Sequence, residues 1–472
     1  MKKTVCTLVG LLLFPWAASA QSLPTAEEAF SKGDYTAAAK QYESVLENAT
    51  GANRLQAQLR LAACQYRLGE FLTAAKTMLS YPLPENELWR ARFLLYRIQM
   101  EQQASGLYSP LLNKREIASE QAQNDLETWT KEQWEAQITQ DYEALWSLRA
   151  ALIQAPLEQE TLILNVKDTD TQRLPTLFDW VVYSWSRHLA RQASAAVQPR
   201  QAETSFNAYA RFVPAQQATA QKLAELLKTA YLLDGKNRQN AKIFWQTDYV
   251  LLPFEYTTLF TLTNEDAAKK AVLSELNVLS GFTPQKQGFF EKLKGYVAPA
   301  DTRYGRAYAA FKAADFLFPN GDREEALKIA RFGEKLGDNY YAKRCGEVAK
   351  NILQQELSFN ALPQAVNPQK ATLGFTARNV NRVYVRVYNT SYAELLQLQR
   401  KNSRALNSWD FLSRVEPETI KALLAKAPLK TADTAVSYKR AHYDGQTQVS
   451  LPPLAHGFYF VLASWDPSFD PQ

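Results

Sequence analysis

Apolar residues recur at helical spacing through most of the chain and change to an alternating pattern near its end. The helical spacing occupies the ranges 88–100, 129–153, 174–193, 218–233, 302–317, 323–333 and 340–357. Asp322 is placed to cap the helix over 323–333, and Glu324 and Glu325 in its first turn complement the helix dipole. We therefore expect a long helical region that ends near residue 357.

Two segments near the N-terminus repeat one pattern. Gly33 is followed by Tyr35 and Ala38, and about 36 residues later Gly69 is followed by Phe71 and Ala74. This order of glycine, aromatic residue and alanine is typical of a tetratricopeptide hairpin, whose repeat is about 34 residues. We expect both glycines in turns between paired helices and both alanines at helix contacts. A helical hairpin outside any named repeat is the alternative.

Alternation with a period of two replaces helical spacing beyond residue 359, where Pro363 and Pro368 interrupt any helix. Strands are expected over 372–377, 382–388, 436–443, 446–451 and 458–464, with a helical insertion at 392–398 and 417–424. Asp444 and Gly445 form a favoured two-residue turn, which predicts a hairpin between 436–443 and 446–451. Val383, Val385 and Val387 should face one side of a strand. Strands at this spacing favour most of a β-sandwich.

The first twenty residues have the features of a signal peptide. Lys2 and Lys3 precede an apolar run over 5–14, and Ala18-Ser19-Ala20 matches the small-x-small pattern of a cleavage site. An uncleaved membrane anchor is the alternative, but a run of about ten residues is too short to span a bilayer. We expect residues 1–20 to be removed and a soluble chain beginning at Gln21 to reach the periplasm or the cell exterior.

Composition and charge exclude several classes of protein. Apolar residues make up 46% and charged residues 22%, as in globular proteins. The formal net charge of +6 falls by two when Lys2 and Lys3 are removed, and no cluster of basic residues suggests nucleic-acid binding. Of three cysteines, Cys6 lies in the signal peptide. Cys64 and Cys345 could form a disulfide, but two separately buried thiols are the favoured interpretation.

The sequence contains no recognisable set of catalytic or metal-binding residues. Its three histidines, His188, His442 and His456, have no zinc-helix spacing, and the chain lacks CxxC, GxSxG, P-loop and GxGxxG motifs. We expect His442 on the surface beside the Asp-Gly turn. Asp168 and Asp170 could hold a cation, but an acidic loop between helices is favoured. We therefore predict a protein that is not an enzyme, with no catalytic, cofactor-binding or metal-binding residues and no cofactor.

Tryptophans recur at helical spacing within the helical region. They are Trp129, Trp134, Trp146, Trp180 and Trp185. Such a series could line a ligand groove, but aromatic residues at this spacing more often pack in a core. We expect these to be core residues.

Two motifs in the last part of the chain resemble a known family. Residues 378–388 read R-N-V-x-x-V-Y-x-R-V-Y, and residues 451–464 read L-P-x-L-x-x-G-x-Y-x-V-x-A-S. Both are similar to the first macroglobulin-type β domain of the bacterial α2-macroglobulin family. The motifs lie in the last quarter or so of the chain. In a subgroup of large exported members of this family a long helical region precedes that domain, which fits the layout expected here.

The resemblance implies a role in trapping or inhibiting proteases in the cell envelope. The family captures proteases with a bait segment and a Cys-x-Glu-Gln thioester, and Cys345 is instead followed by Gly-Glu-Val. No functional residue is therefore transferred to this chain, which could supply a recognition or positioning arm. The expected partners are proteins, with proteases among the candidates, and neither nucleic acid nor a membrane. A tetratricopeptide-type adaptor in envelope assembly or uptake is the competing interpretation.

These patterns together predict a multidomain, mainly α protein. Residues 1–20 form a signal peptide, residues 21–357 a tetratricopeptide-like helical solenoid, and residues 371–472 a macroglobulin-like antiparallel β-sandwich with a helical insertion. In the resembled family another β domain follows closely, so we expect this chain to be the front portion of a longer architecture.

Overall fold

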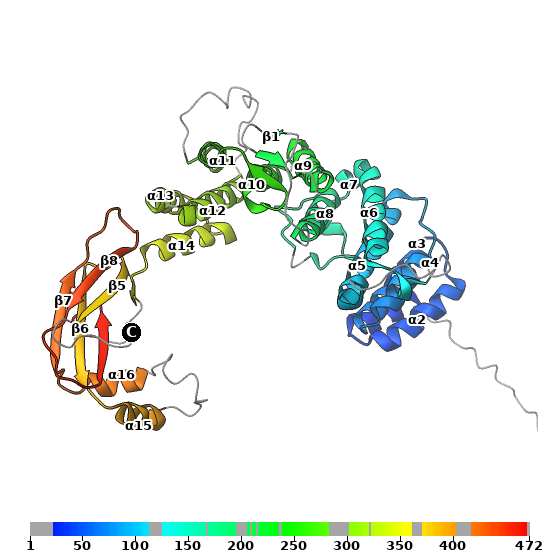
Figure 1. Ribbon diagram of the computed structural model, residues 1–472. Coiled ribbons are helices and arrows are strands. Elements are labelled where there is room, and N and C mark those ends of the chain that lie inside the picture. Colours follow the sequence, from blue (N-terminus) through cyan, green and yellow to red (C-terminus); the bar gives the residue numbers. More distant parts are fainter. Residues whose placement is uncertain are drawn as a thin grey trace, which may run out of the picture. The chain divides into compact units, whose positions relative to one another are not determined.

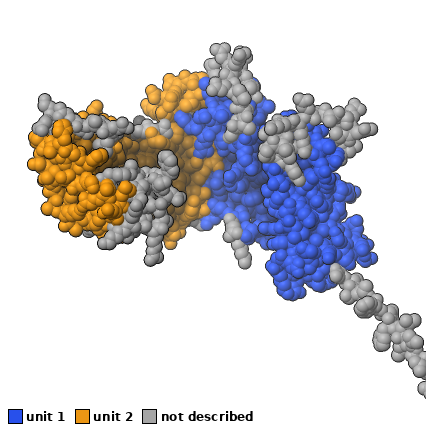
Figure 2. Space-filling view, turned by 60° about the horizontal axis from the view of Figure 1, so that its bottom comes forward, with its two compact units in different colours: residues 1–206, 211–245, 252–261 blue, residues 207–210, 246–251, 262–472 orange. Residues whose placement is uncertain are grey.

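The protein is mainly helical, with small antiparallel sheets towards its C-terminus (Figure 1). The computed structural model describes residues 22–112, 125–166, 169–194, 205–207, 210–213, 216–235, 238–282, 302–320, 322–360, 371–402 and 417–469. The predicted signal peptide, Asp168, Pro363 and Pro368 lie outside these ranges. The chain divides into two compact units (Figure 2), one of residues 1–206, 211–245 and 252–261, the other of residues 207–210, 246–251 and 262–472.

The first unit begins with two helical hairpins. They pair α1 (Leu23–Ser31) with α2 (Tyr35–Asn48), and α3 (Gly51–Arg67) with α4 (Phe71–Ser80). Gly33 and Gly69 lie in the two turns with φ of 82° and 83°, a left-handed conformation that glycine adopts without strain. Ala38 and Ala74 are fully buried in hydrophobic clusters between helices. The predicted turns and helix contacts are therefore confirmed.

The rest of the first unit is also helical. It contains α5 (Glu87–Leu112), α6 (Lys131–Ser147), α7 (Arg149–Gln154), α8 (Leu177–Ser194), α9 (Gln217–Leu232), the start of α10 (Gln239–Glu255), and the 3₁₀ turns η2 (Leu126–Thr128) and η3 (Leu157–Gln159). The short strands β1 (Ser205–Asn207), β2 (Ala210–Phe212) and β3 (Phe260–Leu262) form a sheet in the order β1-β2-β3. The sequence pattern did not predict this sheet, because three-residue strands are too short to show alternation.

The tryptophans of this unit belong mainly to its core, as predicted. Trp134, Trp146 and Trp185 are buried, whereas Trp129 and Trp180 are half-buried. Trp185 stacks on Tyr142 with a centroid distance of 5.2 Å and an interplanar angle of 3°. Trp129 contacts Trp134 edge-on at 5.0 Å. Both are favourable aromatic geometries.

A buried ion pair joins α8 to the residue before α10. The fully buried carboxylate of Asp179 accepts hydrogen bonds from the Arg238 guanidinium, from Trp245 Nε1 at 2.9 Å, and from the backbone N and hydroxyl of Thr176 at 3.2 and 2.7 Å. A buried carboxylate is tolerated only when donors replace the water that it loses. These contacts therefore fix the relative positions of the two helices.

Four helices open the second unit. They are α11 (Glu265–Ser280), α12 (Arg303–Asn320), α13 (Arg323–Glu334) and α14 (Tyr340–Leu353). The predicted cap of α13 is confirmed, since Asp322 Oδ1 accepts a hydrogen bond from Glu325 N at 3.2 Å. Gly333 lets α13 approach its neighbours closely, because a Cβ there would collide with Cys345 Sγ and lie 2.9 Å from Ala310 Cβ.

Strands β4 to β9 form two three-stranded antiparallel sheets. One contains β4 (Glu356–Phe359), β5 (Thr372–Arg378) and β8 (Gly445–Ser450) in the order β4-β5-β8, and the other contains β7 (Lys430–Ala435), β6 (Arg382–Asn389) and β9 (Tyr459–Ser464) in the order β7-β6-β9. Val383, Val385 and Val387 on β6 and Phe375 on β5 are buried in one core that both sheets share. The prediction that the three valines face one side is confirmed.

The predicted hairpin over residues 436–451 is wrong. Residues 430–435 form β7 and pair with β6, whereas β8 pairs with β5, so the two strands lie in different sheets. Residues 436–444 form a loop that contacts α13, and Gly445 begins β8. Glycine is needed at that point because a Cβ would lie 3.0 Å from the Ser437 carbonyl oxygen and 2.9 Å from the Tyr438 ring.

The helix predicted over 340–357 ends early. α14 stops at Leu353, and Glu356–Phe359 form β4, which pairs with β5 through Glu356↔Arg378 to Phe359↔Phe375. Pairing with β5 therefore places residues 356–357 in a strand, although their local sequence pattern fits a helix. The predicted helical insertion is confirmed as α15 (Tyr392–Asn402) and α16 (Pro417–Leu424). Within the described ranges, no helix is long and apolar enough to cross a membrane.

Candidate functional site

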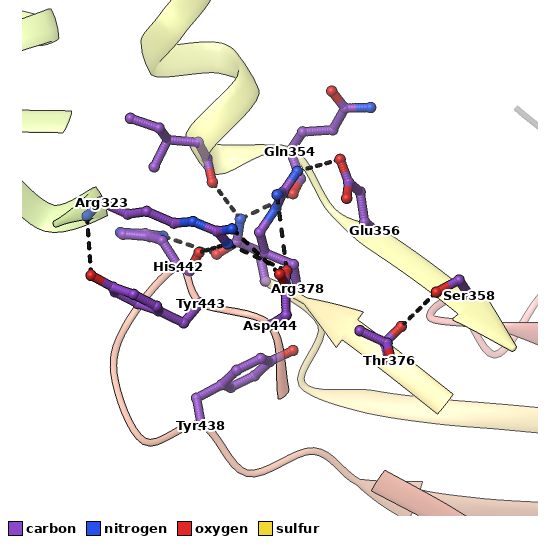
Figure 3. Close-up of polar contacts among 12 residues, drawn as sticks. Arg323, Gln354, Glu356, Ser358, Thr376, Arg378, Tyr438, His442, Tyr443 and Asp444 are labelled. Carbon is purple, nitrogen blue, oxygen red and sulfur yellow. Dashed lines mark hydrogen bonds and ion pairs between the residues drawn. The ribbon is translucent and has the colours of Figure 1, made fainter. Parts of the chain in front are cut away.

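Polar side chains gather in the second unit where the helices meet the sheets (Figure 3). They come from the start of α13, the start of β4, the end of β5 with the turn after it, and the loop 436–444. We call this set the joint and define it by Arg323, Glu356, Arg378, Asn379, Tyr438, His442, Tyr443 and Asp444. It connects segments that are more than a hundred residues apart in sequence.

Arg323 is the contribution of α13 to the joint. Its Nη1 donates to the His442 carbonyl oxygen at 2.8 Å, and its two terminal nitrogens reach the two carboxylate oxygens of Asp444, each at 3.3 Å. The guanidinium carbon also lies 5.4 Å from the centroid of the Tyr443 ring. This planar, forked arrangement is available to arginine and not to lysine. Arg323 thereby attaches the start of α13 to the loop.

Asp444 lies between two arginines. Its Oδ1 is 3.3 Å from Arg323 Nη1 and 3.9 Å from Arg378 Nη1. Arg378, whose side chain is only 10% exposed, also pairs with the Glu356 carboxylate at the start of β4. Positive and negative groups therefore alternate through the joint and their charges balance, which lowers the cost of holding them partly out of water.

The side chain of Asn379 caps the C-terminal end of α14. Its Nδ2 donates to the carbonyl oxygens of Ile352 at 2.7 Å and Gln354 at 3.0 Å, which the helix leaves without partners. Its Oδ1 then faces His442 Nδ1 at 2.9 Å, so the imidazole carries a proton on Nδ1. Asn379 adopts φ of 55° and His442 φ of 64°, left-handed conformations that few residues other than glycine adopt.

The loop is fastened to the sheet by Tyr438. Its hydroxyl accepts a hydrogen bond from Val380 N at 2.9 Å and donates one to Val380 O at 2.7 Å. Partial burial raises the pKa of Tyr438, so the hydroxyl keeps the proton that it donates. One side chain thus satisfies both backbone groups of Val380.

The loop also completes the N-terminus of α13. Arg323 N donates to Tyr443 Oη at 3.3 Å, and Arg440 lies 3.6 Å from the capping carboxylate of Asp322. The first N–H groups of a helix need such acceptors. Within the joint each carboxylate faces a guanidinium and each hydroxyl serves the backbone, an arrangement that holds two substructures together.

The joint corrects one prediction and gives a second residue a new role. His442, predicted as a surface histidine, is half-buried and contacts both α13 and Asn379. Asp444, predicted only as a turn residue, is an ion-pair partner. The available signal was Tyr443, an aromatic residue that contacts arginine, but its partner Arg323 lies 120 residues earlier in the chain.

The other histidines and the acidic residue named in the sequence analysis lie apart from the joint. His188 is buried on α8 in the first unit, and His456 is exposed in a turn before β9. Asp170 accepts a hydrogen bond from Arg173 N at 3.1 Å, as expected of a loop carboxylate. Across the described ranges, no three histidine, cysteine or acidic side chains form a group that could hold a metal ion.

Both cysteines of the described residues are free and buried, which confirms the favoured interpretation. Burial raises the pKa of each thiol, Cys64 and Cys345, to about 12. A thiol with so high a pKa provides almost no thiolate at neutral pH and is a poor nucleophile.

Comparisons with known proteins leave the family open. Neither a protein-family model nor a curated protein matches the chain. Function therefore has to be inferred from the residues and contacts of this chain.

Proposed function

We propose that the chain is a non-catalytic scaffold of the cell envelope, the recognition and positioning arm of an α2-macroglobulin-like protease inhibitor. In this proposal a cleavable signal peptide directs the chain to the periplasm or the cell exterior. The tetratricopeptide-like helices contact partner proteins, and the macroglobulin-like β domain holds these helices in position. The single observation that supports this most directly is the joint.

The joint gives a structural role to the motif on which the family resemblance depends. Arg378, Asn379 and Val380 open the R-N-V-x-x-V-Y-x-R-V-Y pattern. Arg378 pairs with Glu356, Asn379 caps α14, and Val380 is buried in the core of the sheets. The motif thus consists of residues that a β domain needs when it follows a helical hairpin directly, which supports a functional pairing of helices and β domain.

A positioning role also requires that helices and sheets keep a fixed geometry. In the second unit, ion pairs, a helix cap and backbone hydrogen bonds together attach α13 and α14 to the sheets. A flexible linker would make few such contacts. The joint is therefore suited to transmit the position of the helices to the β domain.

A tetratricopeptide-type adaptor is the second candidate. It is favoured by the two hairpins α1–α2 and α3–α4, whose turn glycines and contact alanines occupy equivalent positions. Stacked hairpins of this kind offer extended surfaces to partner proteins. The two candidates differ in their partner, which is a protease in the first and an assembly or uptake protein in the second.

Binding to inactivated proteases distinguishes the two candidates. The chain is immobilised and exposed to serine, cysteine and metallo-endoproteases whose active sites are chemically blocked. The inhibitor proposal predicts reversible binding to at least one class. Because no Cys-x-Glu-Gln is present, active proteases should give no adduct that survives denaturing electrophoresis. Folded protein that binds none of the classes would reject the inhibitor and leave the adaptor.

Export is tested separately by N-terminal mass spectrometry of the protein recovered from the envelope fraction of a bacterial host. We expect a chain that begins at Gln21. A protein that retains Met1 would contradict the proposed signal peptide.

A further inference from the structure

A polar pocket of about 390 Å³ lies between α5, α6 and α8 in the first unit. Its lining residues are Gln102, Ser105, Gly106, Lys131, Glu135, Ile138, His188, Arg191 and Gln192. The volume falls in the range of ligand-binding pockets, about 300–1,000 Å³. Most of these side chains are hydrogen-bonding or charged, which favours a polar ligand.

The centre of the pocket is held in place by its own hydrogen bonds. His188 is 5% exposed, and its Nδ1 lies 3.2 Å from Gln102 Nε2 while its Nε2 lies 3.3 Å from Glu135 Oε2. Gln192 Nε2 also donates to Glu135 Oε2. Burial alone would raise the pKa of Glu135, but the hydrogen bonds from His188 and Gln192 lower it below its ordinary value. Glu135 is therefore an ionised carboxylate that already has partners.

Two cations of the pocket form no hydrogen bond or ion pair among the described residues, although the charge of Lys131 helps to lower the pKa of Glu135. Lys131 is the first residue of α6, and Arg191 lies near the end of α8. Among the described residues, neither side chain forms an ion pair within 4.0 Å. Lys131 also lies at the positive end of the α6 dipole. Lys131 and Arg191 outnumber Glu135, the single carboxylate of the lining, so the lining carries a net positive charge.

We propose that this pocket binds a carboxylate group. Lys131 and Arg191 supply the positive charge and the N–H donors that a carboxylate accepts. The Nε2 groups of Gln102 and Gln192 are engaged within the protein, which leaves their carbonyl oxygens as acceptors for backbone N–H groups and favours a carboxylate carried by an extended peptide over a free small acid. The inference is independent of the protease-inhibitor proposal, since any acidic peptide segment would meet these requirements.

Fluorescence anisotropy with the full chain tests the proposal. The probe is a labelled octapeptide of alternating glutamate and glycine, and its control has glutamine in place of each glutamate. We expect saturable binding of the acidic probe, about tenfold weaker binding of the control peptide, and about tenfold weaker binding of the acidic probe by Arg191→Gln and by Lys131→Gln. Both substitutions are at positions that are not buried, so the fold should be retained.

Arg187→Gln is the matched control. Arg187 is exposed on α8, one turn before Arg191, and does not line the pocket. The same change of charge there should alter affinity less than twofold. Equal losses in Arg187→Gln and Arg191→Gln would show non-specific attraction and overturn the proposal, as would failure to bind both the acidic probe and glutarate.

Competition with free glutarate identifies the source of the carboxylate. Glutarate that displaces the probe at the concentration at which the peptide binds, with a loss in Arg191→Gln, would support a site for small acids. Displacement only at far higher concentration would support an acidic peptide.

Discussion

The charged cluster of α5 and α6 in the first unit differs from the joint in charge balance and in burial. In the first unit, Arg97 pairs with Asp141 at 2.9 Å, and Glu101 lies nearby with both carboxylate oxygens buried and without a hydrogen-bond partner. One arginine therefore faces two carboxylates. In the joint, two arginines alternate with two carboxylates, and Asp444 is half exposed.

This difference decides whether the stability that each cluster contributes depends on pH or on salt concentration. Burial first, and then the charge of Asp141, raises the pKa of Glu101 to about 8, so Glu101 keeps its proton in the folded protein near neutrality. Burial also raises the pKa of Asp141. The first cluster should therefore respond to pH. The joint, whose charges are balanced and partly in water, should respond to salt.

The largest expected effect is the pH dependence caused by Glu101. The unfolded chain loses this proton near the ordinary pKa of 4.5, whereas the folded protein holds it up to pH about 8. The folded state thus binds more protons between these values, and the free energy of unfolding should fall by roughly 1.4 kcal/mol per pH unit as pH rises. Glu101→Gln should reduce this slope in chemical denaturation measured from pH 5 to 8.

Glu87→Gln, an exposed position at the start of the same helix, is the control and should leave the slope unchanged. Parallel pH profiles for Glu101→Gln and the unmodified protein would show that Glu101 ionises normally.

An apolar contact should respond to neither pH nor salt. Ala38 is fully buried between helices of the first hairpins, so Ala38→Phe should overpack the contact and cost about 1–3 kcal/mol. Lys40→Phe, at an exposed position of the same helix, is the control. Thermal unfolding measures both. A melting curve unchanged by Ala38→Phe would place the residue outside a helix contact.

The joint should lose stability in a way that salt reduces. Arg323→Met removes the forked contact with Asp444 and the hydrogen bond to His442, with an expected cost of about 1–2 kcal/mol because Asp444 is half exposed. The cost should shrink at about 1 M salt, where charges are screened within about 3 Å.

Arg331→Met is its control, because Arg331 forms an exposed pair with Glu334 on the same helix, and it should cost under about 0.5 kcal/mol. If both variants have the same free energy of unfolding at low salt, Arg323 does not attach α13 to the loop.

The smallest expected effect is a difference in stability between two variants of Asn379, which distinguishes the cost of backbone strain from the loss of the helix cap. Asn379→Ala and Asn379→Gly both remove the hydrogen bonds to Ile352 and Gln354, but only alanine keeps the strain of a left-handed residue. The alanine variant should be less stable than the glycine variant by about 1 kcal/mol in chemical denaturation. Equal stability would mean that the backbone relaxes away from this conformation.

Features set by local sequence could be predicted, and features set by distant residues could not. The turns at Gly33 and Gly69 and the buried face of β6 follow from patterns a few residues long, with periods of 3.6 and 2. The end of α14 was misplaced because residues 356–359 pair with β5. No local pattern carries that information.

The polar sites show the same limit more strongly. Arg323 and Asp444 meet across 121 positions, and His188 contacts Gln102 across 86. The arginines, aromatic residues and histidines were visible in the sequence, but their partners depend on how helices and loops pack. Hence His442 was assigned to the surface, and the pocket around His188 was not foreseen.

The buried thiols have a practical consequence for measurement in solution. Maleimide labels react with thiolate, and Cys64 and Cys345 are inaccessible and remain protonated at neutral pH. A cysteine introduced on the surface of each unit should therefore take up a dye much faster than either native thiol. Energy transfer between such dyes would report the distance between the two units without any need to replace Cys64 or Cys345.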